Sequence, residues 1–231
     1  MSASNVLYGA PRLHGELLKL GIEVSQATVA KYMVKHRKPP SQTWRTFLEN
    51  HVKQLMSVDF FMVPTVSFRI LYVFLVLAHE RRRVLHFNVT EHPTAEWTAA
   101  QLAQAFPWDT APRYLLRDRD RIYGHAFRTQ ATNMEIIEVL TAPRSPWQSP
   151  YVERLVGSIR RECLDYVVVM SESSLRRHMA SYLDYYHGSR SHLSLRKDSP
   201  DGRAVEPPEM GQIVAVPKVG GLHHRYERRA A

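Results

Sequence analysis

Residues 54–63 read QLMSVDFFMV, and residues 67–78 read SFRILYVFLVLA. Both stretches are rich in β-branched and aromatic residues, so we predict two strands, the second buried on both faces. Further strands are predicted at residues 82–89, 114–118 and 136–140. Helices are predicted at residues 94–106, 126–134, 149–166 and 173–186. Three consecutive strands followed by alternating helices and strands indicate an α/β layer fold.

The first 40 residues predict two short helices. Pro11 stands near the start of the first helix, Gly21 ends it, and Ser25 is the expected N-cap of the second. A helix-turn-helix motif has this pattern, and so does an ordinary helical hairpin. In the first interpretation, the second helix exposes side chains that would touch bases and phosphates, namely Gln26, Thr28, Lys31 and Lys35.

Composition narrows the class of partner. The chain has 231 residues and a formal net charge of +9, and 24 of its 31 basic residues are arginine. An arginine-rich, strongly basic chain is typical of proteins that bind nucleic acid, although a merely basic enzyme has the same charge. The single cysteine excludes a disulfide framework. The longest apolar run covers residues 70–78, far short of the roughly 20 residues that span a membrane.

Three acidic positions depart from their surroundings. Asp59 lies inside an otherwise apolar strand, where an unpaired carboxylate costs several kcal/mol, so it needs an arginine, an exposed strand end or a metal ion. Asp118 and Asp120 follow a second apolar strand and share its parity. Glu153 lies in the first turn of the helix that begins at Ser149 and Pro150, where the helix dipole also favours an acid.

Each acid also has an explanation that involves no metal ion. Asp118 and Asp120, for example, fit a charged turn in which Arg117, Arg119 and Arg121 balance their charge. Taken together, an aspartate on the first strand, an aspartate after a later strand and a glutamate on a following helix can converge on one hard cation. Mg²⁺ prefers a few carboxylates together with water and phosphate oxygens. Two such ions roughly 3.5–4 Å apart would clamp the attacking and leaving oxygens of a phosphodiester.

These residues resemble the catalytic core of retroviral-integrase-like DDE transposases, specifically the bacterial insertion-sequence type. The resemblance lies in three segments with the acids: SVDFF at 57–61, YLLRDRDRIYG at 114–124 and SPWQSPYVERLVGSIRRECLDYV at 145–167. Asp118 and Glu153 are 35 positions apart, close to the spacing of the family's last two acids. Further segments of the same lineage are HPTAEW at 92–97, YLDYYHGSRSHLSL at 182–195 and VGGLHHRYERRAA at 219–231.

The resemblance implies a ribonuclease-H-like core with a five-stranded mixed sheet flanked by helices. It implies strand nicking by hydrolysis and strand transfer by transesterification, with Mg²⁺ or Mn²⁺ and two ions when DNA is bound. Asp59, Asp118 and Glu153 carry over as the metal-binding catalytic triad, and Asp120 stands where many relatives have glycine. Arg160 corresponds to a basic helix position that contacts the DNA end.

The resemblance also predicts the domain organisation and the partners. We expect a helix-turn-helix-like DNA-binding segment at 1–40, an integrase-like catalytic core at 41–187 and an irregular basic tail at 188–231, with a short β element near 213–216. The partners would be double-stranded DNA, as transposon ends and target, and further copies of the chain in a homo-oligomer on DNA. No membrane is expected as a partner, and the expected location is the bacterial cytoplasm.

Two other functions remain open at this stage. The chain begins at about the second helix pair of such transposases, so it could be a truncated remnant that binds DNA without catalysis. A ribonuclease-H-like nuclease acting on hybrids or junctions is the other alternative, against which the N-terminal helix pair and the transposase-like tail argue.

Overall fold

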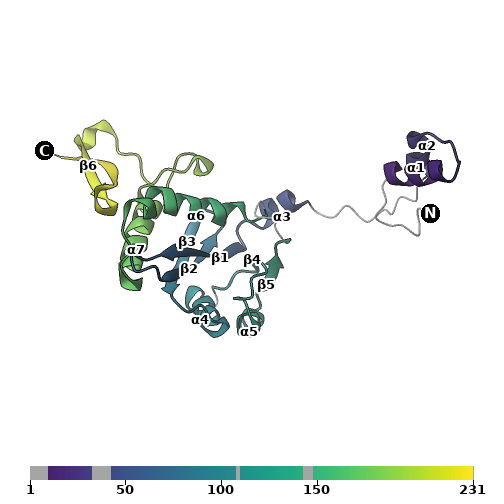
Figure 1. Ribbon diagram of the computed structural model, residues 1–231. Helices are drawn as coiled ribbons and strands as arrows, with labels where there is room; N and C mark the ends of the chain where they lie inside the picture. Colours follow the sequence, from purple (N-terminus) through teal and green to yellow (C-terminus); the bar gives the residue numbers. More distant parts are fainter. Residues whose placement is uncertain (1–9, 33–42, 108–109, 143–147, 231) are drawn as a thin grey trace. The chain divides into compact units, whose positions relative to one another are not determined.

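The computed structural model describes residues 10–32, 43–107, 110–142 and 148–230. The chain divides into two compact units, Met1–Thr43 and Trp44–Ala231. Two helices lie in the described part of the first unit, and the sheets lie in the second (Figure 1).

A five-stranded mixed sheet forms the centre of the second unit. Its strands are β1 (Leu55–Pro64), β2 (Ile70–Ala78), β3 (Arg83–Thr90), β4 (Tyr114–Arg117) and β5 (Ile137–Leu140), in the order β3-β2-β1-β4-β5. The pairs β1/β2 and β2/β3 are antiparallel, whereas β1/β4 and β4/β5 are parallel. Because β1 joins the antiparallel half to the parallel half, it is hydrogen-bonded on both sides.

Helices cover both faces of this sheet (Figure 1). They are α4 (Ala95–Ala105), α5 (His125–Asn133), α6 (Pro150–Glu162) and α7 (Glu172–Gly188). Val73, Leu75 and Leu77 of β2 pack on the side of α6 and α7, and Phe74 and Val76 pack on the side of α4 and α5. All five are fully buried, which confirms the prediction that this strand is covered on both faces.

The predicted strands and helices of the core are present, with boundaries shifted by a few residues. Thr94 caps α4 as predicted, because its hydroxyl accepts the amide N–H of Trp97 at 3.1 Å. The largest shift is at the end of α6, which stops at Glu162 instead of continuing to residue 166. Cys163 leaves the helical conformation there, and a short 3₁₀ helix, η2 (Leu164–Tyr166), follows.

One helix was not predicted from the sequence. It is α3 (Trp44–His51), and its apolar side chains Trp44, Phe47 and Leu48 pack against Leu55 and Leu116 at the ends of β1 and β4. The spacing of these residues is helical, so the signal was present but short. Tertiary packing stabilises a helix that its length alone would leave marginal.

The first unit contains α1 (Ala10–Lys19) and α2 (Gln26–Tyr32). Leu13 and Val29 are buried between them. Ser25 caps α2, since its hydroxyl accepts the amide N–H of Thr28 at 3.1 Å. The connection covers residues 20–25, which is longer than the 3–4 residues typical of a helix-turn-helix. The choice between that motif and a helical hairpin stays open.

The β element predicted near residues 213–216 of the C-terminal tail is present, as one strand of an antiparallel hairpin that was not predicted. Its strands are β6 (Gln212–Lys218) and β7 (His223–Arg229), and three short 3₁₀ helices lie in this part of the chain: η3 (Leu193–Leu195), η4 (Pro208–Met210) and η5 (Val219–Gly221). The sequence HHRYERR of β7 has no strand-like alternation of apolar residues. Ion pairs of Glu227 with Arg225 and Arg229 offset its charge once the hairpin forms.

No helix in the described parts of the chain combines the length and the apolar character needed to cross a membrane.

A truncation in the sheet tests this account of the core. We expect Phe74→Ala to lower the free energy of unfolding by about 3–5 kcal/mol, because it opens a cavity between β2 and the α4/α5 layer. Phe68→Ala is the control, since that side chain is 92% exposed in the turn between β1 and β2. It should change stability by less than about 0.5 kcal/mol. Urea unfolding measures both, and equal effects would contradict the packing.

Candidate active site

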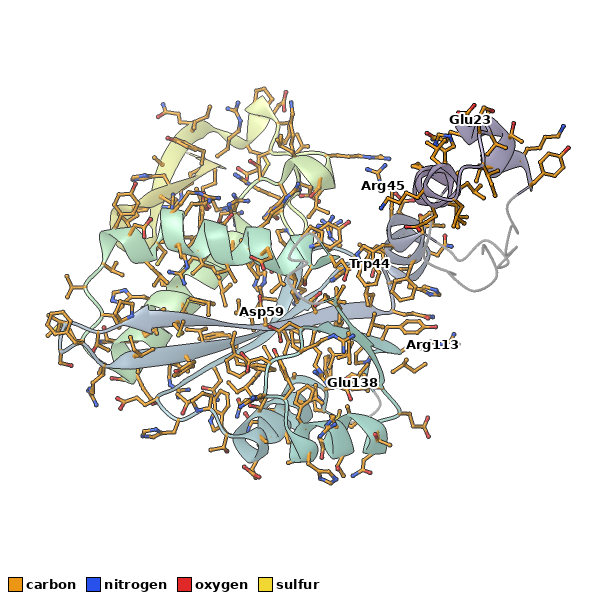
Figure 2. All side chains as sticks on the ribbon, turned by 45° about the vertical axis from the view of Figure 1, so that its right-hand side comes forward. Glu23, Trp44, Arg45, Asp59, Arg113 and Glu138 are labelled. Atoms are coloured by element: carbon orange, nitrogen blue, oxygen red, sulfur yellow. The ribbon has the colours of Figure 1, made fainter. Side chains whose placement is uncertain are left out.

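Strand pairing brings Asp59 and Asp118 together. In the parallel pair β1/β4, Leu55 is opposite Tyr114 and Ser57 is opposite Leu116. The same offset, continued by two residues, places Asp59 beside Asp118, where β4 has just ended and β1 continues. Figure 2 shows Asp59 near the middle of the sheet, on β1. The pair therefore lies at the carboxyl end of β4, where the two strands separate.

Helix α6 brings Glu153 to the same place. Two turns further along α6, the Arg160 guanidinium donates to the carbonyl oxygen of Met62 at 3.1 Å and lies 5.6 Å from the Phe61 ring. Glu153 precedes Arg160 by about 10 Å along the helix, and Asp59 precedes Met62 by about 10 Å along β1. The start of α6 therefore lies near Asp59.

The raised pKa of Asp59 is consistent with the other acids lying near it. The pKa of Asp59 is raised from 3.8 to about 7, first by burial and then by the charges of Asp118, Glu153 and Asp120. The amide N–H of Phe60, which donates to Asp59 Oδ1 at 2.8 Å, opposes this shift. Of the three acids, Asp118 raises the Asp59 pKa most.

Among the described residues, Arg117, Arg119 and Arg121 form no ion pair with Asp118 or Asp120. Arg117 pairs with Glu138 and donates to the backbone carbonyl of Asp118, and Arg119 donates to the carbonyl of Thr141 at 3.0 Å. The carboxylates themselves accept backbone N–H groups, Asp118 Oδ1 from Asp120 and Asp120 Oδ1 from the following turn.

The acidic residues of this site therefore have no counter-ion among the residues that the structure describes. Among the described residues, no ion pair includes Asp59, Asp118, Asp120 or Glu153. The described residues also contain no group of three His, Cys, Asp or Glu side chains arranged closely enough to hold a metal ion. The acids are neighbours, but their side chains are not drawn together as ligands. Carboxylate oxygens without counter-ions nevertheless fit a hard divalent cation.

Tyr123 forms part of the wall beside the acids, and sequence reasoning missed it. Burial raises its pKa well above 10, and the charges of Asp59 and Asp118 raise it further. Its ring packs between Phe60 and Phe127, with centroid distances of 5.9 and 5.0 Å. The hydroxyl is buried and has no partner in the described part of the protein. The sequence signal was only an aromatic residue shortly after the acidic turn.

A buried contact fixes the start of α6. Ser57 Oγ and His79 Nε2 lie 2.5 Å apart, and the His79 ring packs edge-on against Tyr151 at 4.8 Å. Burial lowers the His79 pKa to about 3, with a contribution from Arg82, so the ring is neutral at pH 7. Because Tyr151 precedes Glu153 by two residues, these contacts position the helix that carries the glutamate. Nothing in the sequence near His79 signals this contact, which joins positions 22 residues apart.

The residues predicted to contact DNA lie in two places. Gln26, Thr28 and Lys31 are exposed on α2 in the first unit, and Thr28 also shares a hydrogen bond with the Ser25 hydroxyl. Arg160 is exposed on α6 in the second unit. Lys35 lies outside the described residues. The predicted triad, in contrast, lies wholly within the second unit.

Comparisons with known proteins agree with this fold. The family model described as "Integrase core domain" matches residues 135–200, a stretch that includes Glu153 but not Asp59 or Asp118. A search of curated proteins found no match.

Solved structures of integrases and a transposase resemble the chain. A chain of the simian T-cell lymphotropic virus intasome in complex with the PP2A regulatory subunit B56 gamma has a TM-score of 0.54 at 12% identity, covering 94% of this chain and 86% of that chain. The Mos1 transposase catalytic domain with Raltegravir and Mg has a TM-score of 0.51 at 15% identity, covering 61% and 75%. The dimeric form of the HTLV-2 integrase catalytic core domain with magnesium has a TM-score of 0.50 at 12% identity, covering 65% and 94%.

The likeness at these identities establishes the fold. The protein has the ribonuclease-H-like α/β fold of integrases and transposases, with a five-stranded mixed sheet flanked by helices, as predicted. Among proteins with this fold, the match to the integrase core model supports a relationship to integrases and transposases.

Replacing Asp59 tests the electrostatics of the site. The pKa of Asp59 is raised on folding, so the folded state binds the proton more tightly, and stability falls as pH rises from about 4 to about 7. An asparagine side chain carries no charge and avoids this cost. In EDTA, we expect Asp59→Asn to match wild type near pH 4 and to be more stable above pH 7, by at most about 4 kcal/mol. Denaturant unfolding across pH measures this, and a gain that does not vary with pH would contradict the shift.

Two buried tyrosines, one with and one without a hydrogen-bond partner for its hydroxyl among the described residues, provide a matched test of this site. Tyr123 buries a hydroxyl without a partner among the described residues, whereas the Tyr182 hydroxyl donates to Glu162 at 2.9 Å. We expect Tyr123→Phe to keep or raise stability, by up to about 1 kcal/mol, and Tyr182→Phe to lower it by about 1.5–3 kcal/mol. Thermal or urea unfolding measures both. An equal loss in the two variants would mean that the Tyr123 hydroxyl is hydrogen-bonded in solution.

Proposed function

We propose that the chain is a DDE transposase of the bacterial insertion-sequence type, which cleaves DNA strands and joins them to target DNA. The observation that carries the proposal is that Asp118 and Glu153 lie close enough to the buried Asp59 to raise its pKa, on a ribonuclease-H-like sheet and without ion-pair partners among the described residues. The match of the family model to residues 135–200 supports it.

In this proposal, Asp59, Asp118 and Glu153 are the catalytic residues and hold Mg²⁺ or Mn²⁺, as two ions when DNA is bound. The structures of the HTLV-2 integrase core and the Mos1 catalytic domain were solved with magnesium. Bound ions supply activation of a water molecule or a DNA 3′-hydroxyl and neutralise charge that develops on the phosphate. Burial is the main cause of the raised Asp59 pKa, and the charges of the neighbouring acids add to it; a bound cation would oppose both.

Asp118 is preferred to Asp120 as the second acid. The β1/β4 register continues to Asp118, and Asp118 affects the pKa of Asp59 more than Asp120 does. Asp120 instead shapes the turn, because its carboxylate accepts the amide N–H of Ile122 at 3.1 Å.

The other residues of the site position the acids and exclude water. Tyr123 and Phe60 form an apolar wall next to Asp59. The Ser57, His79 and Tyr151 contact holds the start of α6 against β1 and so orients Glu153. Because the strands and helix already hold the three acids near one another, only their side chains would need to move when metal and the phosphodiester bind.

DNA would be recognised by both units. We assign base contacts to Gln26, Thr28 and Lys31 and phosphate contacts to Lys35 and Arg160. The partners are transposon ends and target DNA, and two ends call for a homo-oligomer on DNA, in the bacterial cytoplasm. Similar structures include a dimeric form of the HTLV-2 integrase core and a viral intasome.

A cleavage and strand-transfer assay tests the function. Supercoiled plasmid and the element's own flanking ends are incubated with Mg²⁺, Mn²⁺ or EDTA. We expect metal-dependent nicking and joining, lowered about a thousandfold or more by Asp59→Asn, Asp118→Asn or Glu153→Gln, because a bound metal contributes several kcal/mol to such reactions. Asp120→Asn should keep most of the activity.

The matched control is Glu96→Gln, the same change in the first turn of α4. It should leave activity unchanged. Activity lost at Asp120 and kept at Asp118 would move the second acid. DNA binding without cleavage would favour a catalytically silent remnant, and cleavage of RNA–DNA hybrids alone would favour a ribonuclease. Thermal unfolding with added Mn²⁺ gives a second measurement, because the ion should stabilise wild type and not Asp59→Asn.

A further inference from the structure

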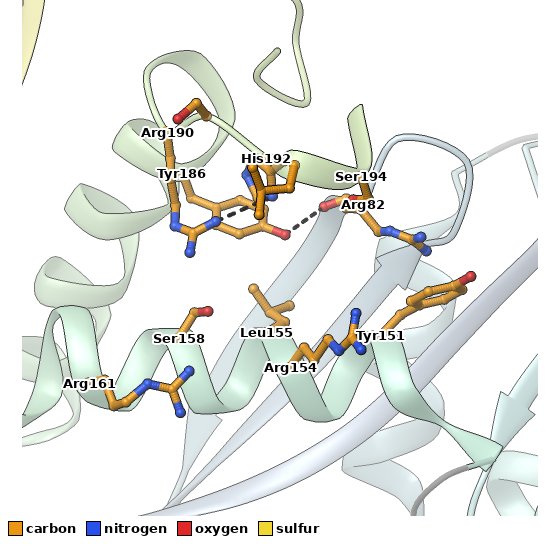
Figure 3. Close-up of a pocket in the computed structure, with 12 residues that line it drawn as sticks. Arg82, Tyr151, Arg154, Leu155, Ser158, Arg161, Tyr186, Arg190, His192 and Ser194 are labelled. Carbon is orange, nitrogen blue, oxygen red and sulfur yellow. Dashed lines mark hydrogen bonds between the residues drawn. The ribbon is translucent and has the colours of Figure 1, made fainter. Parts of the chain in front are cut away.

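A basic cavity lies on a different face of α6 from Glu153. Its volume is about 450 Å³, and it is formed by α6, the turn between β2 and β3, and the segment that follows α7 (Figure 3). From α6 it includes Arg154, Ser158 and Arg161, which recur at helical spacing. Glu153 and Arg160 belong to another face of the same helix.

Four arginines line the cavity, and its lining contains no acid among the described residues. Only Arg190 is neutralised, by two hydrogen bonds to Glu162 at 2.7 and 2.8 Å. Arg82, Arg154 and Arg161 form no ion pair with any acid in the described ranges. Three positive charges therefore surround the cavity without a counter-ion from this part of the chain.

One residue that lines the cavity, His192, presents a buried donor. His192 is 8% exposed, and its Nδ1 accepts from Arg190 Nη1 at 3.3 Å. Because arginine can only donate, the ring proton is on Nε2. Burial and the charge of Arg190 lower the His192 pKa to about 4, so the ring is neutral. The Nε2–H group is buried and forms no hydrogen bond of normal geometry among the described residues; the backbone of Tyr186 only opposes the lowering of the His192 pKa. Such a donor fits an anionic acceptor.

The rest of the lining is held in place before any ligand arrives. The Arg82 guanidinium lies 3.2 Å from the centre of the Tyr151 ring, and its Nη1 donates to the carbonyl of His79. The Tyr186 hydroxyl donates to the carbonyl of Arg82 at 3.1 Å, and its ring packs edge-on against His192. Hydroxyls of serines complete the set of donors around the cavity: Ser158, Ser191 and Ser194.

We propose that this cavity binds a phosphate group of a DNA strand. A phosphate has several acceptor oxygens and a charge that suits guanidinium groups, hydroxyls and one imidazole N–H. The proposal rests on the proposed function, in that the ligand is a strand of the DNA on which the chain acts. Since Arg154 directly follows Glu153 on α6, a phosphate held here fixes the strand beside the acids without contributing to catalysis.

Inorganic phosphate is the first probe. The ring nitrogens of His192 are followed by ¹H–¹⁵N spectroscopy of histidine-labelled, full-length protein in EDTA. We expect phosphate to shift the Nε2 signal of wild type in a saturable way. Arg154→Gln/Arg161→Gln should weaken this response tenfold or more. Both side chains are exposed, so the variant should fold, and its thermal unfolding verifies this.

DNA is the second probe, and fluorescence anisotropy of a labelled duplex in EDTA measures its binding. The double variant should weaken binding by several-fold to tenfold and reduce the slope of log affinity against log salt by about 1, the loss of one phosphate contact. The matched control is Arg128→Gln/Arg177→Gln, which removes two exposed arginines outside the cavity. This control should change the slope of log affinity against log salt by less than Arg154→Gln/Arg161→Gln does.

Two outcomes would overturn the proposal. Equal effects of the two double variants on DNA binding, together with a phosphate-induced shift at His192, would assign the cavity to a free phosphate compound. No shift at His192 and no difference in DNA binding would remove the site altogether. Asp59→Asn should bind DNA like wild type in EDTA, so a failure of the proposed catalysis would leave this test intact.

Discussion

The pairing of β1 with β2 on one side and with β4 on the other is the constraint on which the rest of the structure depends. A strand bonded on both edges and covered by helices must be largely apolar, and β1 is apolar except where Ser57 and Asp59 interrupt it. The parallel register with β4 then determines which residue comes to lie beside Asp59. The same strand supplies Phe61 and the carbonyl of Met62, against which α6 packs.

At Asp59, this arrangement lowers the stability of the folded protein at neutral pH while placing a carboxyl group where the proposed function needs one. Asp59 carries a raised pKa because burial and three neighbouring acids disfavour its charge. No arginine in the described ranges pairs with Asp59, and the arginines of the neighbouring turn, Arg117 and Arg119, are bonded to Glu138 and to the carbonyl of Thr141. A cation would offset the cost in a way that no protein group in the described structure does. Strain of this kind at a sheet centre is typical of catalytic sites.

Helix α6 contributes residues both to the acidic site and to the basic cavity, and one set of packing contacts holds it in place. Its buried residues Val152, Leu155 and Ile159 fix it to the sheet. With that face occupied, Glu153 lies close enough to Asp59 to raise its pKa, and Arg154 and Arg161 line the basic cavity. The contact of His79 with Tyr151 and the stacking of Arg82 on the same ring tie the start of the helix to both regions. A change at Tyr151 would therefore disturb the acids and the cavity together.

The sequence by itself determined the elements whose signals are local. The apolar runs of β1 and β2, the caps at Thr94 and Ser25 and the misplaced acid Asp59 are legible without a structure, because burial, capping and charge act within a few residues. The helix α3 was too short for such a signal, and β7 has the composition of a loop. The register that places Asp59 beside Asp118, the wall formed by Tyr123 and the cavity built on Arg190 and His192 were decided only by tertiary structure. Each of them joins residues distant in sequence, and only the packed sheet and helices bring those residues within contact distance.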